Sequence, residues 1–247
     1  MEAIERALDV AQIVMQNGGS TAMADRTFKN ILKGYRQEGV SASWRLDFVA
    51  VSGLAAGRSL TVLRPVGPIG VNLGRASEAT VLGERVARGE VDTAALVSEV
   101  ERLNALPPRY NRWALIAAAA FAAAAFSQIP GGDWGALGVA LMAGGVGQFV
   151  RSLLQARKLP VAPVTLLCGA LSACLAGVGL RLGLSQTVPA TAVASVIYLV
   201  PGLPLINGFI DLVSHKYLAV GLERMANAVF LFLLLAIAMA FAQTVVL

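Results

Sequence analysis

The sequence of 247 residues is poor in charged side chains, with only 14% Asp, Glu, Lys and Arg against the roughly 25% of a typical soluble domain. Hydrophobic residues make up 56% and the mean hydropathy is +0.67. This balance predicts an integral membrane protein and excludes disordered, collagen-like and coiled-coil proteins. The net charge of +5 forms no basic block, which excludes a nucleic-acid-binding protein.

Thiols and histidines are scarce as well. Cys168 and Cys174 are the only cysteines, and their spacing places them about 120° apart around a helix, so we expect no disulfide between them. With His215 as the single histidine, the usual ligands of a zinc or iron–sulfur site are missing. We therefore expect no metal, no cofactor and no enzymatic activity.

The first 112 residues predict a small cytoplasmic α+β domain, because helical and strand-like patterns alternate there. Ser20 and Asp92 stand where helix caps are expected. The predicted elements are helices ending at Gly18 and starting after Ser20, strands over 44–50 and 58–64 joined by a turn over 52–57, and helices over about 76–88 and 93–106. The strand over 44–50 is expected to bury Trp44, Leu46, Phe48 and Ala50.

Five apolar segments follow, each close to the roughly 17–25 residues that cross a bilayer as a helix. They lie at about 113–129, 134–150, 160–181, 189–213 and 225–246. We expect two domains, a cytoplasmic one over 1–112 and a bundle of five transmembrane helices over 113–247. Small residues at every fourth position, as at Ala136, Ala140 and Gly144, indicate closely packed helices.

Basic residues gather in alternate connections. Arg109 and Arg112 precede the first segment, Arg151, Arg157 and Lys158 follow the second, and His215, Lys216 and Arg224 follow the fourth, whereas Asp133 and Arg181 border the other two connections. The positive-inside rule then places the N-terminus in the cytoplasm and the C-terminus outside. The N-terminus lacks the pattern of a secretory signal. We expect a multi-pass protein of a bacterial inner membrane.

The fourth segment contains an unusual polar and helix-breaking motif. Pro201, Gly202 and Pro204 interrupt a helix, and Asn207 and Asp211 lie one turn apart on the helix that follows. Discontinuous helices often form the substrate or ion site of transporters. We expect these five residues to line such a pathway. The alternative is a structural kink with Asp211 at the cytoplasmic headgroups.

Four further residues are candidates for the same pathway, each with a simpler interpretation beside it. Gln148 could contact a polar solute or pack between helices. His215 could relay protons or lie at the interface. Ser20 has no His or Cys base within residues 1–112, which favours a helix cap over a nucleophile. Asp25, like Arg26, is expected on a solvated helix face, with docking against the membrane half as the alternative.

Several stretches together resemble the threonine/serine exporter family: LVPGLPLINGFIDL at 199–212, GGSTAMADRTF at 18–28, GVNLGRASEA at 70–79 and RVARGEVD at 85–92. The resemblance covers nearly the whole chain, in order. It is to the N-terminal half of the family's transporters, a cytoplasmic domain followed by five membrane helices. Because the chain ends at Leu247, it is similar to the split members, whose second half is a separate small membrane protein.

The resemblance implies a secondary exporter of small polar metabolites, which are threonine and serine in the namesake members and dicarboxylates such as succinate in some split ones. It implies a small membrane-protein partner subunit within the lipid bilayer, with a homo-oligomer as an alternative. A non-transporting membrane sensor or regulatory subunit is the alternative function. The residues leave the substrate and any proton coupling open.

Carried over by position, the family's proline–glycine break falls on Pro201–Gly202 and its polar pair on Asn207 and Asp211. Its glycine–serine–threonine motif falls on Gly19, Ser20 and Thr21. This chain departs from the family at 23–25, where Met-Ala-Asp replaces the usual arginine, aliphatic residue and glutamate.

Overall fold

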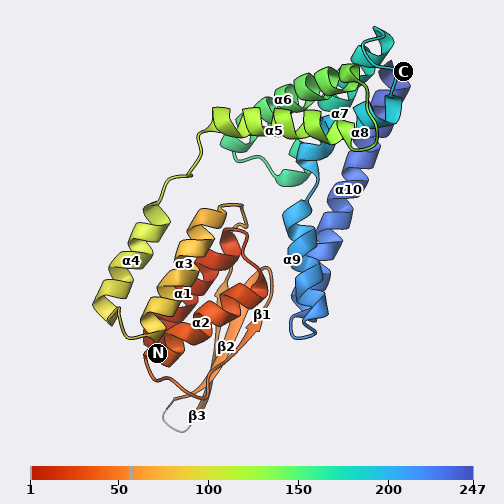
Figure 1. Cartoon of the computed structure of the whole chain (residues 1–247). Helices are drawn as coiled ribbons and strands as arrows, with labels where there is room; N and C mark the ends of the chain where they lie inside the picture. Colours follow the sequence, from red (N-terminus) through yellow and green to blue (C-terminus); the bar gives the residue numbers. More distant parts are fainter. Residues whose placement is uncertain (1, 56–57, 247) are drawn as a thin grey trace. The chain divides into compact units, whose positions relative to one another are not determined.

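The computed structural model describes residues 2–55 and 58–246 and is mostly helical, with one small sheet (Figure 1). The chain divides into two compact units that are not continuous in sequence. Unit 1 contains Met1–Arg109 and Gly202–Asn227, and unit 2 contains Tyr110–Pro201 and Ala228–Leu247. The predicted division at 112/113 concerns the solvent around each part and stays a prediction.

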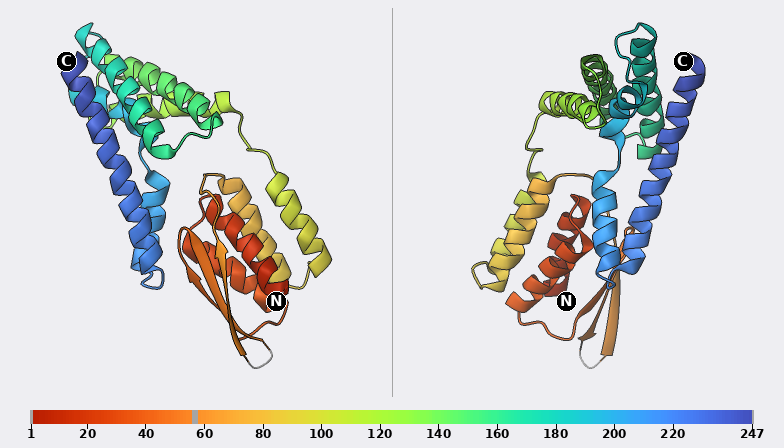
Figure 2. Two further views of the ribbon diagram at one scale, coloured as in Figure 1. Left: turned by 180° about the vertical axis from the view of Figure 1, so that it is seen from behind. Right: turned by 45° about the vertical axis from the view of Figure 1, so that its right-hand side comes forward.

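Unit 1 combines helices with a three-stranded sheet. Its elements are α1 (Glu2–Gln16), α2 (Thr21–Gly34), β1 (Ser41–Trp44), β2 (Phe48–Ala55), β3 (Arg58–Pro65), α3 (Leu73–Ala87), α4 (Thr93–Ala105), α9 (Gly202–Val213) and the start of α10 (Leu218–Val246). The sheet is antiparallel in the order β1-β2-β3, and α1 and α2 lie against one of its faces (Figures 1 and 2). The core between them includes Leu8, Phe28, Trp44 and Val49.

The first predicted strand is wrong in its bounds. A reversal over 45–47, in which Arg45 N donates to Phe48 O, separates β1 from β2. The reversal shifts the alternation of side chains by one position, so Val49 and Val51 are buried in place of Phe48 and Ala50. The turn predicted at 52–57 is also wrong over 52–55, which belong to β2, and its last two residues lie outside the described residues.

The predicted caps are confirmed. Ser20 Oγ accepts a hydrogen bond from the backbone N–H of Met23 at 3.2 Å, and Asp92 Oδ1 accepts one from Ala95 at 2.7 Å. Each cap satisfies a backbone donor that the first turn of a helix would otherwise leave without a partner. The loop serine is thereby used as a structural group, as its surroundings in the sequence predict.

Unit 2 is wholly helical in the part of the chain that the structure describes. Its elements are α5 (Arg112–Gln128), α6 (Trp134–Ala156), α7 (Val161–Arg181), α8 (Val188–Val196), the short 3₁₀ helix η1 (Ile197–Leu199) and the C-terminal part of α10. Small residues let these helices approach closely; a Cβ added at Gly144 of α6 would lie 2.7 Å from the Cβ of Ala123 on α5. Both cysteines are free, as expected.

Within the described residues, three helices, α6, α7 and α10, are long and apolar enough to cross a membrane, and α8–η1 with α9 makes a fourth if the interrupted pair is one span. α5 is a shorter apolar helix, so the predicted count of five spans stays a prediction. Two predicted segments were too short: α6 continues to Ala156 and α10 begins at Leu218. Arg151 and Arg224, which the sequence places in connections, therefore lie within helices.

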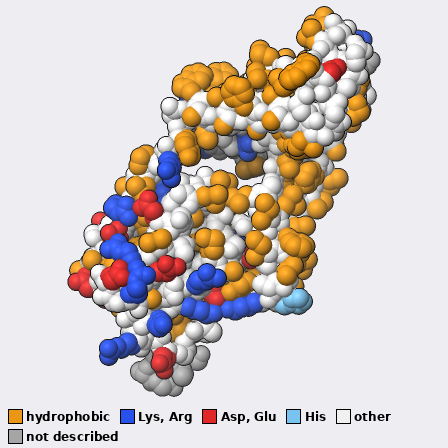
Figure 3. Space-filling view, in the orientation of Figure 1, with side chains coloured by type: hydrophobic (Ala, Val, Ile, Leu, Met, Phe, Trp, Pro, Cys, Tyr) orange, Lys and Arg blue, Asp and Glu red, His pale blue; other side chains and the backbone are white. Residues whose placement is uncertain are grey.

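The surface differs between the two units. On the face shown in Figure 3, side chains of Lys, Arg, Asp and Glu gather on unit 1, and hydrophobic side chains cover much of unit 2. Exposed apolar residues on the helices of unit 2 include Phe121, Met142 and Leu167. Such a surface is expected where lipid replaces water as the solvent.

Candidate functional site

Asp211 on α9 is fully buried, and it pairs with Arg224 on α10. Arg224 Nε lies 3.2 Å from Asp211 Oδ2, and only 5% of the arginine side chain is exposed. Thr21 Oγ1, in the first turn of α2, donates a hydrogen bond of 2.8 Å to the same oxygen. Asp211 Oδ1 has no hydrogen-bond partner among the described residues. A buried ion pair with an unsatisfied oxygen is costly, which favours a functional role.

Glycines bring α9 and α10 close enough for this pair. A Cβ added at Gly221 of α10 would lie 3.0 Å from the carbonyl oxygen of Gly208 on α9, and one at Gly208 would lie 3.2 Å from Arg224 Cβ. The two backbones can approach this closely only because neither glycine carries a side chain. Arg224 was not among the site residues predicted from the sequence, because the hydropathy pattern places it in a connection and not in a helix.

The loop before α2 contacts the same group. Asn207 Nδ2 donates to the carbonyl oxygen of Gly18 at 2.9 Å, and Arg224 Nη2 donates to that of Gly19 at 3.4 Å. Gly18 has a φ of +92°, a conformation that favours glycine. We call Gly18–Thr21, Asn207, Asp211 and Arg224 the Asp211 centre. The structure thus brings the predicted polar pair of α9 together with the glycine–serine–threonine motif.

Asp25 was expected on a solvated face, and that expectation is wrong, because Asp25 is only 4% exposed whereas Arg26 is exposed as predicted. Its Oδ2 accepts hydrogen bonds from Lys29 Nζ at 2.6 Å and from Lys216 Nζ and Tyr217 OH at 2.7 Å each. Trp44 Nε1 donates to Oδ1 at 3.0 Å. The carboxylate therefore joins α2 and β1 to the turn between α9 and α10.

The environment of Asp25 changes its acidity. Burial by itself would raise the pKa of this carboxyl, but the hydrogen bonds from Lys216, Lys29, Tyr217 and Trp44 outweigh burial and lower the pKa from 3.8 to about 2. The same contact raises the pKa of Lys216 above its ordinary value. Asp25 is therefore ionised at neutral pH and acts as the acceptor of a buried network.

The break in the fourth apolar segment is narrower than predicted. The helix is interrupted between Leu199 and Gly202, where Pro201 provides no backbone donor. Pro204 lies in the first turn of α9, in which backbone N–H groups have no partner within the helix. Pro204 therefore fits the helix it was expected to break.

Two further candidate residues, His215 and Gln148, form none of the hydrogen bonds that define the Asp211 centre among the described residues. His215 is exposed in the turn between α9 and α10, with its Nδ1 2.8 Å from the carbonyl oxygen of Val213. Gln148 is half-buried on α6, and its Oε1 has no hydrogen-bond partner among the described residues. The roles of His215 and Gln148 in a pathway therefore stay predictions.

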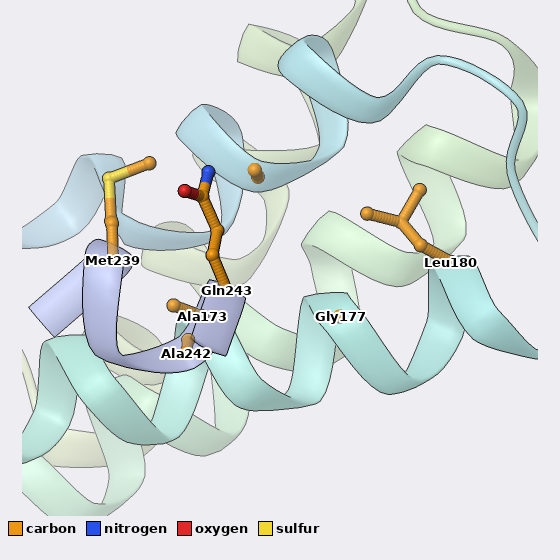
Figure 4. Close-up of a pocket in the computed structure, with 7 residues that line it drawn as sticks. Ala173, Gly177, Leu180, Met239, Ala242 and Gln243 are labelled. Atoms are coloured by element: carbon orange, nitrogen blue, oxygen red, sulfur yellow. The ribbon is translucent and has the colours of Figure 1, made fainter. Parts of the chain in front are cut away.

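A small cavity lies among α7, α8 and α10 within unit 2 (Figure 4). Its volume is about 10 Å³, and apart from Gln243 its lining is apolar, with Ala173, Gly177 and Met239 among its residues. A volume of this size holds at most about one water molecule. The cavity is too small for a metabolite in this conformation.

Comparisons with known proteins agree over nearly the whole chain. A family model described as "Putative threonine/serine exporter" matches residues 5–246. The "Probable succinate transporter subunit YjjP" of Klebsiella aerogenes is 25% identical over 241 residues, which cover 96% of this chain and 91% of the relative. The protein of the same name from Escherichia coli K12 is 24% identical over 233 residues, covering 94% and 90%. No solved structure matches the chain.

Proposed function

The chain belongs to the threonine/serine exporter family, and we propose that it is one subunit of a secondary exporter of small polar metabolites. The candidate substrates are amino acids of the threonine and serine type and dicarboxylates such as succinate. Both relatives are named as transporter subunits, which supports a further subunit in this assembly as well. We expect that subunit to be a small membrane protein.

The observation that carries the proposal is the buried Asp211–Arg224 pair, which joins α9, the helix that follows the interruption, to α10. Asp211 is fully buried, with an exposed fraction of 0%. A charged pair within an apolar segment costs free energy, and a membrane anchor or a passive regulatory subunit has no need of it. Broken helices with polar groups beside the break are typical of transporter binding sites.

In the Asp211 centre, the two charged side chains would each bind a different group of the substrate. A carboxylate of the substrate would compete with Asp211 for Arg224, whereas a proton or an ammonium group would compete with Arg224 for Asp211. Asn207 also donates a hydrogen bond to the carbonyl oxygen of Gly18, and Arg224 donates one to that of Gly19. Separation of the ion pair would therefore release the loop before α2, which couples binding to movement of α9 and α10.

Efflux from cells loaded with labelled substrate tests the assignment. Asp211→Asn keeps the side-chain volume and removes the charge, and we expect efflux to fall by about tenfold or more at matched membrane abundance. The control is Glu38→Gln, an exposed carboxylate of unit 1, which should leave efflux unchanged. Normal efflux by Asp211→Asn would remove this centre from the pathway.

A double variant separates transport from folding. Asp211→Asn alone leaves Arg224 as a buried charge without its partner, which can destabilise the chain. Asp211→Asn combined with Arg224→Gln removes both charges and should recover thermal stability. If the pair serves transport, the double variant stays inactive although it is stable. Recovery of efflux together with stability would show that the pair is only structural.

The need for a partner subunit is tested by reconstitution. We expect the purified chain alone to give no flux of serine, threonine or succinate across liposomes. Co-reconstitution with the proposed small membrane-protein subunit should give flux. Robust flux from this chain alone would support a homo-oligomer instead.

A further inference from the structure

Arg151 is a second arginine within an apolar helix, and it lies in unit 2. The residue is five positions before the end of α6 at Ala156, about 8 Å along the helix. Its Nη1 donates a hydrogen bond of 2.9 Å to the carbonyl oxygen of Tyr198 in η1, directly before the interruption at Val200–Pro201. Among the described residues, no carboxylate forms an ion pair with Arg151.

The composition of unit 2 explains the missing partner. Its residues, 110–201 and 228–247, contain five basic side chains but Asp133 as the single acidic one. Asp133 is already used, because it accepts hydrogen bonds from the backbone N–H groups of Ala136 and Gln186 and from Ser185 Oγ. Among its described residues, unit 2 therefore offers no free side-chain carboxylate to Arg151, and none to the ammonium group of a solute.

Further polar groups lie on the same stretch of α6 and on the helices packed against it. Gln148 lies three residues earlier, on the same helix face, where its Nε2 group could donate to a carboxylate; its buried Oε1 has no hydrogen-bond partner among the described residues. Tyr198 OH is 2.9 Å from Ser172 Oγ. Gly147 makes room for that hydroxyl, since a Cβ there would lie 2.0 Å from it. These groups are neutral or positive, as an anion site requires.

We propose that Arg151, with Gln148 beside it, binds a carboxylate of the transported solute and selects dicarboxylate anions over zwitterionic amino acids. The inference rests on the proposed transport function and narrows its substrate class. A guanidinium has five donors, so the bond to the Tyr198 carbonyl leaves others for a carboxylate held through two parallel bonds. An amino acid would bring an ammonium group into a unit that offers it no acid.

Equilibrium binding to the purified full-length chain in detergent tests the proposal, with labelled succinate and labelled serine as the probes. We expect wild-type protein to bind succinate more tightly than serine. Arg151→Gln should raise the Kd for succinate by about tenfold or more, and Arg151→Lys by less, because lysine keeps the charge but not the planar fork. The matched control is Arg157→Gln, an exposed arginine at the end of α6, which should bind like wild type.

Several outcomes would overturn the proposal. The first is a folded Arg151→Gln variant that binds succinate as tightly as wild type. The proposal would also fail if this variant lost a bound anionic lipid or the partner subunit while its affinity for succinate stayed the same. Equal affinity of wild-type protein for serine and succinate would refute the selection of dicarboxylates. Where Arg151→Gln does not fold, Arg151→Lys carries the test, because it can still donate to the Tyr198 carbonyl.

Efflux from intact cells that also express the partner subunit separates this inference from the proposed function. If wild-type protein exports neither probe, the proposed function fails. If wild-type protein exports succinate and Arg151→Gln exports it at the same rate, only the assignment of Arg151 fails. Loss of succinate efflux by Arg151→Gln, with normal efflux by Arg157→Gln, supports both.

Discussion

Asp25 joins the helices and the sheet of unit 1 to the turn between α9 and α10 through its four donors. Asp25→Asn replaces an acceptor oxygen with an amide donor and leaves Lys216 and Tyr217 without their partner. We expect this variant to unfold more easily, by about 1–3 kcal/mol, because buried polar groups lose their hydrogen bonds. Thermal unfolding of the full chain in detergent, followed by tryptophan fluorescence, measures the loss.

The control for Asp25 is Glu38→Gln, which removes an exposed carboxylate from the same unit and should shift the melting temperature little. Equal melting temperatures for wild type and Asp25→Asn would contradict a structural role for this network. Since Asp25 lies in the segment where the family usually has a glutamate, the same measurement on Asp25→Glu shows whether the longer side chain fits the four donors.

The low pKa of Asp25 predicts a stability that depends on pH. The folded carboxyl has a pKa of about 2 and the unfolded one the ordinary value of 3.8, so the unfolded state binds a proton more readily. The stabilising contribution is complete above about pH 4 and is lost as the pH falls towards 2, with a total of about 2 kcal/mol. As the pH is lowered from about 4 to about 2, Asp25→Asn should therefore lose less stability than wild type does. Parallel curves for the two proteins would show that Asp25 titrates normally.

The glycines of α6 are not equivalent, although they lie on one helix. A Cβ at Gly147 would lie 2.0 Å from Tyr198 OH and 2.1 Å from Ser172 Oγ, whereas nothing lies within 4 Å of a Cβ at Gly138. We expect Gly147→Ala to destabilise the chain by about 1–3 kcal/mol, because the extra methyl group displaces both hydroxyls.

Gly138→Ala is the matched control on the same helix. Its added methyl group meets no neighbour, so the variant should be as stable as wild type or slightly more so. Comparison of the two melting temperatures in detergent checks the packing of α6 against α7 and η1. A Gly147→Ala variant as stable as Gly138→Ala would show that this contact is loose.

The orientation of the whole chain remains predicted from its basic residues. Arg151 and Arg224 no longer count, because they lie within helices, but Arg109, Arg157 and Lys216 still lie in alternate connections. The prediction of a cytoplasmic N-terminus and an external C-terminus therefore stands. A reporter enzyme that is active only outside the membrane should be active when fused to the C-terminus and inactive when fused after Pro160. The opposite pattern would reverse the topology.

Composition and periodicity predicted a membrane protein with a helical bundle, a small sheet and a capped helix after Ser20. These features depend on local spacing and on the solvent around each segment, both of which can be read along the chain. The family could be recognised for the same reason, because its motifs are short runs of consecutive residues. Asn207 and Asp211 were predicted as pathway residues from such a local motif.

The partners of these residues could be identified only in the tertiary structure. Thr21 and Asp211 are 190 positions apart, and Asp25 and Lys216 are 191 positions apart. Hydropathy assigned Arg224 to a connection, since a charged residue lowers the mean hydropathy of a segment whether or not another group neutralises the charge. A buried charge becomes acceptable only when a distant group compensates it. Which charges are paired, as Asp211 and Asp25 are, and which is left for a ligand, as Arg151 is, therefore depended on packing.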